Sequence, residues 1–199
     1  MYDEKSWEER YRSTELWSGQ PNAQLVAEVA DLPPGTALDA GCGEGGDALW
    51  LAARGWTVTG ADFATIALKR AAEHAEAAGV QVEWVHADLT SWTPPKRFNL
   101  VTGHFLQLPP EDRAAAFARL ADAVAPGGTL LIVGHAGPAM RHHEHHPPEM
   151  FFTAKVIGAS LGEGWAIEVA EERPRIVHGQ PGEDTVLRAV RRGRPSPET

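Results

Sequence analysis

The stretch LDAGCGEGGDALWLAARGWTVTGADF, from Leu38 to Phe63, decides the fold. It completes a short apolar run, residues 36–40, that is typical of a buried strand, and then turns through several glycines. Residues 46–54 predict a helix that ends at Gly55, a C-terminal cap. A second apolar run, residues 56–62, predicts another strand. A glycine-rich turn between a strand and a helix lets a ligand approach the backbone closely.

The same alternation continues along the chain. Further elements are predicted as helices at 22–32, 64–79 and 110–125 and as strands at 80–88, 98–105 and 129–135. After His135 an apolar stretch predicts a helix, and two strands follow at 164–176 and 185–192. Two strands with no helix between them pair antiparallel. We therefore predict an α/β fold: a Rossmann-like, doubly wound sheet of seven mostly parallel strands with a C-terminal antiparallel strand pair.

Composition and charge exclude several classes of protein. The 199 residues carry a formal net charge of −9, which argues against a nucleic-acid groove or an anionic membrane surface as partner. No apolar run approaches the roughly 20 residues that cross a bilayer. The opening MYDEKSWEER is too charged for a signal peptide, and a single cysteine forms no intramolecular disulfide. We expect a cytoplasmic protein, a monomer or a homodimer, with no nucleic-acid or membrane partner.

The glycines indicate a site for an adenosine cofactor. Gly41, Gly43 and Gly46 satisfy the pattern G-x-G-x-x-G between a strand and a helix. Asp62 ends the next strand about 20 residues further on, where a carboxylate can accept hydrogen bonds from both ribose hydroxyls. This pattern alone fits a dinucleotide as well as any other adenosine cofactor.

Three features favour a cationic cofactor over a dinucleotide. Asp39 lies two residues before the first glycine, where its carboxylate would repel a pyrophosphate and attract an ammonium or sulfonium. Asp88 ends the third strand and is placed to accept from an adenine amino group. A dehydrogenase of this length lacks room for a substrate domain, and neither Tyr2 nor Tyr11 has a lysine four positions on.

These residues resemble the class I S-adenosylmethionine-dependent methyltransferases. The motif of an acidic residue followed by x-G-x-G-x-G reads here as Asp39 to Gly45, and the family's second and third acids match Asp62 in TGADF and Asp88 in HADL. PGGTLLIVGH, at 126–135, resembles the turn into that family's fifth strand. The resemblance implies S-adenosyl-L-methionine as cofactor. Together with the strand ends, it predicts these cofactor-binding residues: Trp17, Asp39, Gly41, Gly43, Asp62, Phe63, Asp88, Leu89 and His104.

The N-terminal segment resembles a narrower group. WEERYRSTELWSGQPN, residues 7–22, is similar to the tellurite-resistance and thiopurine methyltransferases, which use an aromatic segment as a lid over the cofactor. Trp17 and Tyr11 would correspond to that lid, and the likeness implies a small acceptor. We predict one methyltransferase domain over 1–199, with a lid and helix at 1–35, a cofactor-binding half at 36–135, and a substrate loop and C-terminal strands at 136–199.

A histidine-rich loop follows the fifth strand. Histidines titrate near neutrality, so RHHEHHPPEM at 141–150 could supply a base for a hydroxyl acceptor. The candidate catalytic residues are His142, His143, His145 and His146. A divalent metal site or a solvated loop are the competing interpretations; a metal is possible but not predicted. Tyr11 and His135 are the candidate contacts to the substrate.

We therefore expect transfer of a methyl group to a small molecule, through a hydroxyl oxygen of a sugar or another metabolite. A thiol, selenium or tellurium acceptor is the alternative within the class. A nicotinamide-dependent oxidoreductase and a protein that only binds the nucleoside are the alternatives from other classes.

Overall fold

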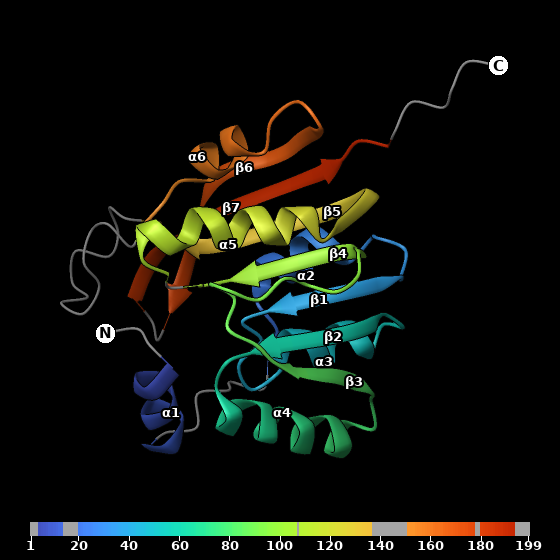
Figure 1. The fold of residues 1–199 in the computed structure, drawn as a ribbon, viewed down its shortest axis with the longest axis vertical. Helices are drawn as coiled ribbons and strands as arrows, with labels where there is room; N and C mark the ends of the chain where they lie inside the picture. The colour runs from blue at the N-terminus through green and yellow to red at the C-terminus, as the bar shows by residue number, and fades with distance from the viewer. Residues whose placement is uncertain (1–3, 14–19, 107, 137–150, 178–179, 194–199) are drawn as a thin grey trace.

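The structure is a computed structural model that describes residues 4–13, 20–106, 108–136, 151–177 and 180–193 (Figure 1). Trp17 and the four histidines at 142, 143, 145 and 146 lie outside the described residues. No helix among the described residues has the length and apolar character that crossing a membrane requires.

A single seven-stranded sheet in the order β3-β2-β1-β4-β5-β7-β6 organises the protein. The strands are β1 (Thr36–Ala40), β2 (Thr57–Asp62), β3 (Val82–His86), β4 (Phe98–His104), β5 (Val124–His135), β6 (Trp165–Val177) and β7 (Gln180–Arg191). The strands from β1 to β5 pair in parallel, and β7 pairs antiparallel with both β5 and β6. The predicted fold class, with its C-terminal antiparallel pair, is confirmed.

Helices cover the sheet on both faces. They are α1 (Glu4–Ser13), α2 (Ala23–Val29), α3 (Gly46–Ala52), α4 (Thr65–Ala78), α5 (Pro110–Asp122) and α6 (Ala154–Ser160). Figure 1 shows α5 in front of β4 and β5, with α2 and α3 behind the sheet. Two helices end or begin where the sequence predicts: α4 is capped by Gly79 in the left-handed conformation, and α5 begins at Pro110.

Alternating residues of β5 bury two separate apolar clusters. Leu130 and Ile132 belong to the cluster with α5, whereas Leu131 and Val133 belong to the cluster with α2. Successive side chains of a strand point to opposite faces, so this run is apolar on both sides. A continuous apolar strand such as β5 is therefore what a sheet covered on both faces requires.

The structure extends two elements beyond the predicted limits. β7 begins at Gln180 and β6 continues to Val177, so most of the segment predicted to join them, 173–184, lies in the hairpin. Cross-strand pairing continues there, and Arg175 of β6 forms an ion pair with Asp184 of β7 at 2.9 Å. The N-terminal segment also contains a helix, α1, which packs beside α4 (Figure 1).

The strand order changes direction at β1. β1 pairs with β2 on one side and with β4 on the other. The chain therefore continues to one side of β1 with β2 and to the opposite side with β4. In open α/β sheets, ligands bind outside the carboxyl ends of the strands at such a switch point. A ligand site is therefore expected at the residues just after β1, β2 and β4.

Candidate functional site

The loop after β1 is built on glycines with positive φ. Gly41 and Gly43 have φ of 74° and 52°, a region that other residues rarely adopt. The Gly41 N–H donates to the Ala61 carbonyl of β2 at 2.7 Å, which fixes the turn. A Cβ on Gly43 would lie 2.8 Å from the hydroxyl of Tyr11, so the side chain from α1 lies directly against this loop.

Asp62, at the end of β2, ties the glycine loop to the next element. Its Oδ2 accepts from the Gly43 N–H at 2.9 Å, and its Oδ1 accepts from the Ala64 N–H at 2.8 Å. Burial raises the pKa of Asp62, and the backbone hydrogen bonds oppose that rise. Each carboxylate oxygen can accept a second hydrogen bond, so both remain able to bind a ligand hydroxyl.

Asp39, in β1, has one oxygen without a partner. Its Oδ1 accepts from the Thr102 hydroxyl at 3.0 Å, whereas its Oδ2 is buried with no hydrogen bond among the described residues. Burial, and then the charge of Asp47, raise the pKa of Asp39 to about 7. Buried polar atoms are nearly always hydrogen-bonded, and each exception needs an explanation. A bound cation with N–H donors is one such explanation.

Asp47 and His104 form a pair beside Asp39. His104 ends β4, and its Nδ1 lies 2.6 Å from the Oδ2 of Asp47 in the first turn of α3. Asp47 Oδ1 accepts from the backbone N–H of Asn22 at 2.6 Å, which fixes the carboxylate. Nε2 of His104 is buried and has no hydrogen bond among the described residues.

Three carboxylates set the charge around His104. Burial alone would lower the pKa of His104, but Asp47, Asp39 and Asp184 raise it, with a net rise. Asp47 is not among the residues predicted from the sequence, because an acidic residue in the first turn of a helix is an ordinary helix-start signal. Its pairing with His104 becomes visible only when the end of β4 lies beside α3.

A second group of side chains lies at the ends of β4 and β5, together with Arg175 of β6. The ring of His135 lies 4.4 Å from that of Phe105, measured between centroids, and Arg175 Nη2 lies 2.9 Å from His135 Nδ1. Because Arg has no acceptor, Nδ1 of His135 accepts this hydrogen bond. Phe105 has φ of 52°, an outlier for a bulky residue of the kind found at functional sites.

Comparison with known proteins shows what this chain is similar to. Residues 37–128, from β1 to the turn within β5, match the family described as the methyltransferase domain. A solved structure, from work on the conversion of a disulfide bond into a thioacetal group during echinomycin biosynthesis, has a TM-score of 0.77 and 25% identity, covering 94% of this chain and 91% of that chain. Over residues 37–128 this chain is therefore similar to methyltransferase domains, and over nearly its whole length it shares the fold of that solved structure.

Other methyltransferases are similar to this chain as well. An uncharacterized methyltransferase of Mycobacterium bovis is 37% identical over 120 residues, and the match spans 59% of this chain but only 60% of the relative's length. Thiocyanate methyltransferase 1 of Brassica oleracea is 25% identical, over 93% of this chain and 82% of the relative. The N-methyltransferase NodS of Bradyrhizobium japonicum, solved with S-adenosyl-L-homocysteine, shares the fold with a TM-score of 0.72 at 17% identity, over 94% of this chain and 98% of that chain.

The remaining predicted cofactor residues lie after β2 and β3. The Phe63 carbonyl accepts from Nε2 of His86 at 2.8 Å. Asp88 is exposed, and its Oδ1 accepts from both the backbone N–H and the hydroxyl of Thr90, at 2.8 Å each. Leu89 is buried in the core cluster beside α5. Asp88 therefore caps a turn, and its predicted contact with adenine stays a prediction.

Tyr11, a predicted substrate contact, lies on the glycine loop. α1 packs on α4, where the Glu8 carboxylate accepts from the Ile66 N–H at 3.3 Å. Burial, and then the charges of Asp62 and Glu44, raise the pKa of Tyr11, so its hydroxyl stays protonated. This side chain is positioned to cover a group bound at Gly43. The second predicted substrate contact, His135, lies on the opposite side of the switch point.

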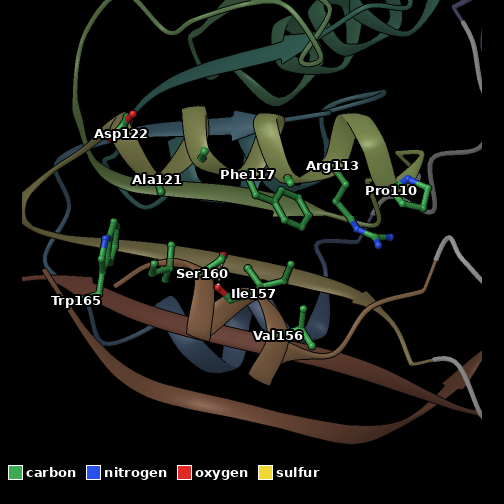
Figure 2. A pocket seen from close by; sticks show the side chains of 12 residues that line it. Pro110, Arg113, Phe117, Ala121, Asp122, Val156, Ile157, Ser160 and Trp165 are labelled. Atoms are coloured by element: carbon green, nitrogen blue, oxygen red, sulfur yellow. Dashed lines mark hydrogen bonds between the residues drawn. The ribbon is translucent and has the colours of Figure 1, made fainter. Parts of the chain in front are cut away.

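A groove of about 460 Å³ lies apart from these residues, between α5 and α6 (Figure 2). Phe117, Ile157 and Trp165 supply apolar walls, and Arg113 lies near one end. None of the residues that line it belongs to the glycine loop or to the Asp39–Asp47–His104 group. The groove is thus separate from the candidate cofactor site.

Proposed function

We propose that this protein transfers a methyl group from S-adenosyl-L-methionine to a small-molecule acceptor. The bound cofactor would supply a methyl group on a positively charged sulfur. The observation that carries the proposal is the buried Oδ2 of Asp39 beside the glycine loop, which no described residue hydrogen-bonds. A carboxylate there suits the ammonium and sulfonium of this cofactor and opposes the pyrophosphate of NAD.

The adenosine half would lie on the β2 side of the switch point. Asp62 would accept hydrogen bonds from the ribose hydroxyls, with the glycine loop below and Tyr11 above. Phe63, Asp88 and Leu89 would border the adenine, because they follow β2 and β3. Residues 1–35 would then act as the lid, and residues 36–135 as the cofactor-binding half.

The methionine half would cross to the β4 side. There the Oδ2 of Asp39 would accept from the α-ammonium, and His104 would border the same part of the cofactor. Asp39, Asp47 and His104 each place one oxygen or nitrogen within 4.8 Å of one another, so the negative charge is concentrated where a cation would lie. This arrangement would orient the methyl group toward His104 and the wall formed by Phe105 and His135.

The acceptor would be a hydroxyl oxygen of a sugar or another metabolite. An anionic acceptor would meet the carboxylates of Asp39, Asp47 and Asp184, whereas a neutral hydroxyl would not be repelled. A hydroxyl is a poor nucleophile while it holds its proton, and this site offers histidines as bases. The second candidate is an ionised sulfur acceptor, which the likeness to a thiocyanate methyltransferase favours.

Two measurements test this function. Titration calorimetry should detect binding of S-adenosyl-L-homocysteine and none of NAD. Asp39→Asn should weaken that binding, and Asp122→Asn, on the exposed end of α5, is the matched control for the loss of a carboxylate. Mass spectrometry should then detect a labelled methyl group on a member of a panel of alcohols, phenols and thiols. Binding of NAD in place of S-adenosyl-L-homocysteine would make the chain a dinucleotide-binding protein.

A further inference from the structure

His104 has the local geometry of a general base. Its side chain is 6% exposed, and Nδ1 is held by Asp47 at 2.6 Å, which leaves Nε2 without a hydrogen bond among the described residues. Asp47 is itself held by the backbone N–H of Asn22. A base oriented by a fixed third group is the arrangement that activates nucleophiles in enzymes.

The place of His104 in the sheet also suits that role. Asp62 and Gly43 mark the β2 side of the switch point, and His104 ends β4 on the other side of β1. A cofactor with its ribose at Asp62 therefore extends its reactive end toward β4. Phe105 follows His104 in the chain, and its ring lies 4.4 Å from that of His135, so an acceptor bound between the ends of β4 and β5 would lie beside these rings.

We propose that His104, oriented by Asp47, takes the proton from an acceptor hydroxyl during methyl transfer. The inference rests on the proposed function. As the oxygen–methyl bond forms and the sulfur–methyl bond breaks, the acceptor O–H bond breaks and its proton passes to Nε2 of His104. The methylated acceptor and neutral S-adenosyl-L-homocysteine leave, and the imidazolium, paired with Asp47, returns its proton to solvent.

The charged groups around the imidazole favour this proton transfer. Asp47 from α3, Asp39 from β1 and Asp184 from β7 all stabilise the protonated ring. Arg175 from β6 pairs with Asp184 and offsets part of that charge. The pKa of His104 is raised as a result, so it accepts a proton more readily, and the rate should rise with pH through a value above that of an exposed histidine.

The first test separates acceptors that need a base from acceptors that do not. Phenol keeps its proton at about pH 8, well below a phenolic pKa of about 10, whereas thiophenol is already ionised. In His104→Gln, kcat with phenol should fall by roughly 10²–10⁴. The ratio of the phenol rate to the thiophenol rate should fall by the same factor, whatever the variant does to the Kd of S-adenosyl-L-homocysteine, because His104 also borders the cofactor.

Controls and contrary outcomes are well defined. His74→Gln, a partly buried histidine on α4, should leave both rates unchanged. Alanine at each loop histidine should also leave the phenol rate intact: His142, His143, His145 and His146. Full phenol activity in His104→Gln would overturn the proposal, and loss at one loop position would move the base there. Methylation of thiophenol but never of phenol by the parent would also overturn it, while the methyltransferase function would stand.

A second test needs no acceptor. Nitrogen-15 NMR of the S-adenosyl-L-homocysteine complex should show His104 as a neutral ring with its proton on Nδ1 above the titration midpoint, leaving Nε2 able to accept. In Asp47→Asn the midpoint should move to lower pH, because the nearest carboxylate is lost. A ring that keeps its proton on Nε2 in the neutral form cannot act as the base.

Discussion

Replacing Asp39 by asparagine should stabilise the fold at neutral pH while it weakens cofactor binding. Asp39 is 2% exposed and accepts from the Thr102 hydroxyl through one oxygen only. Asparagine has the same shape, keeps the accepting oxygen and carries no charge. The substitution therefore removes a buried charge that the fold itself leaves partly unsatisfied, and that a cationic cofactor would use.

The magnitude follows from the pKa of Asp39. Burial and neighbouring carboxylates raise it from 3.8 to about 7. At about 1.4 kcal/mol for each pKa unit, this difference corresponds to roughly 4 kcal/mol. Because the folded state holds the proton more tightly than the unfolded state, the free energy of unfolding falls as the pH rises through this window. The asparagine variant should escape that loss, with its advantage near zero at acid pH and greatest above pH 7.

Urea unfolding of both proteins across this pH range measures the effect. Calorimetry at neutral pH should show S-adenosyl-L-homocysteine binding weakened by about 1.5–3 kcal/mol, the typical value for a hydrogen bond to a charged group. Asp122→Asn should change neither quantity, because that carboxylate is exposed. A stability difference that does not vary with pH would refute the electrostatic reasoning, and an unchanged Kd would remove Asp39 from the cofactor site.

Three further predictions concern the same site. Asp62→Ala should weaken S-adenosyl-L-homocysteine binding by about 1–3 kcal/mol in calorimetry, and an unchanged Kd in a folded protein would leave Asp62 as a loop-fixing residue. Tyr11→Ala should speed release of that ligand in stopped-flow fluorescence, because the side chain lies against Gly43; Tyr11→Phe is the control, and equal release rates would argue against a lid. Dialysis against a chelator should leave methyl transfer intact, whereas loss that added Zn²⁺ or Mg²⁺ restores would identify the Asp39–Asp47–His104 group as a metal site.

Much of the fold could be predicted because local signals and the global arrangement agree. Gly55 and Gly79 both have positive φ at helix ends, where the sequence predicts the stops. β5 is buried on both faces, as its unbroken apolar run indicates. The antiparallel pairing of β6 and β7 was predicted, but its continuation through 173–184 was not, because that segment is rich in charged residues, proline and glycine. Pairing with the partner strand overrides those local preferences.

The candidate site could be predicted only where spacing along the chain carries the information. Asp62 lies 19 residues after Gly43 and hydrogen-bonds to it, as a strand–loop–helix–strand unit requires. Asp47 and His104 are 57 residues apart and meet only because β4 lies beside β1 in the sheet. A histidine at a strand end and an acid in a first helical turn each have ordinary explanations when taken alone. Their pairing is a property of the fold.

The group that the sequence reveals least is also the one that a stable fold would avoid. Asp39, Asp184 and His104 are largely buried, and burial opposes the charged form of each of them. Most proteins give each buried polar group a hydrogen-bond partner within the fold. Buried polar groups that lack such a partner concentrate at functional sites, where a bound ligand supplies it. Asp39 and His104 each have a buried atom with no partner in the described part of the chain, and these atoms belong to such groups: one oxygen suited to a cation and one nitrogen suited to a proton. A protein that only bound the nucleoside cofactor would need the oxygen of Asp39. A transferase that acts on hydroxyls would need both that oxygen and the nitrogen of His104.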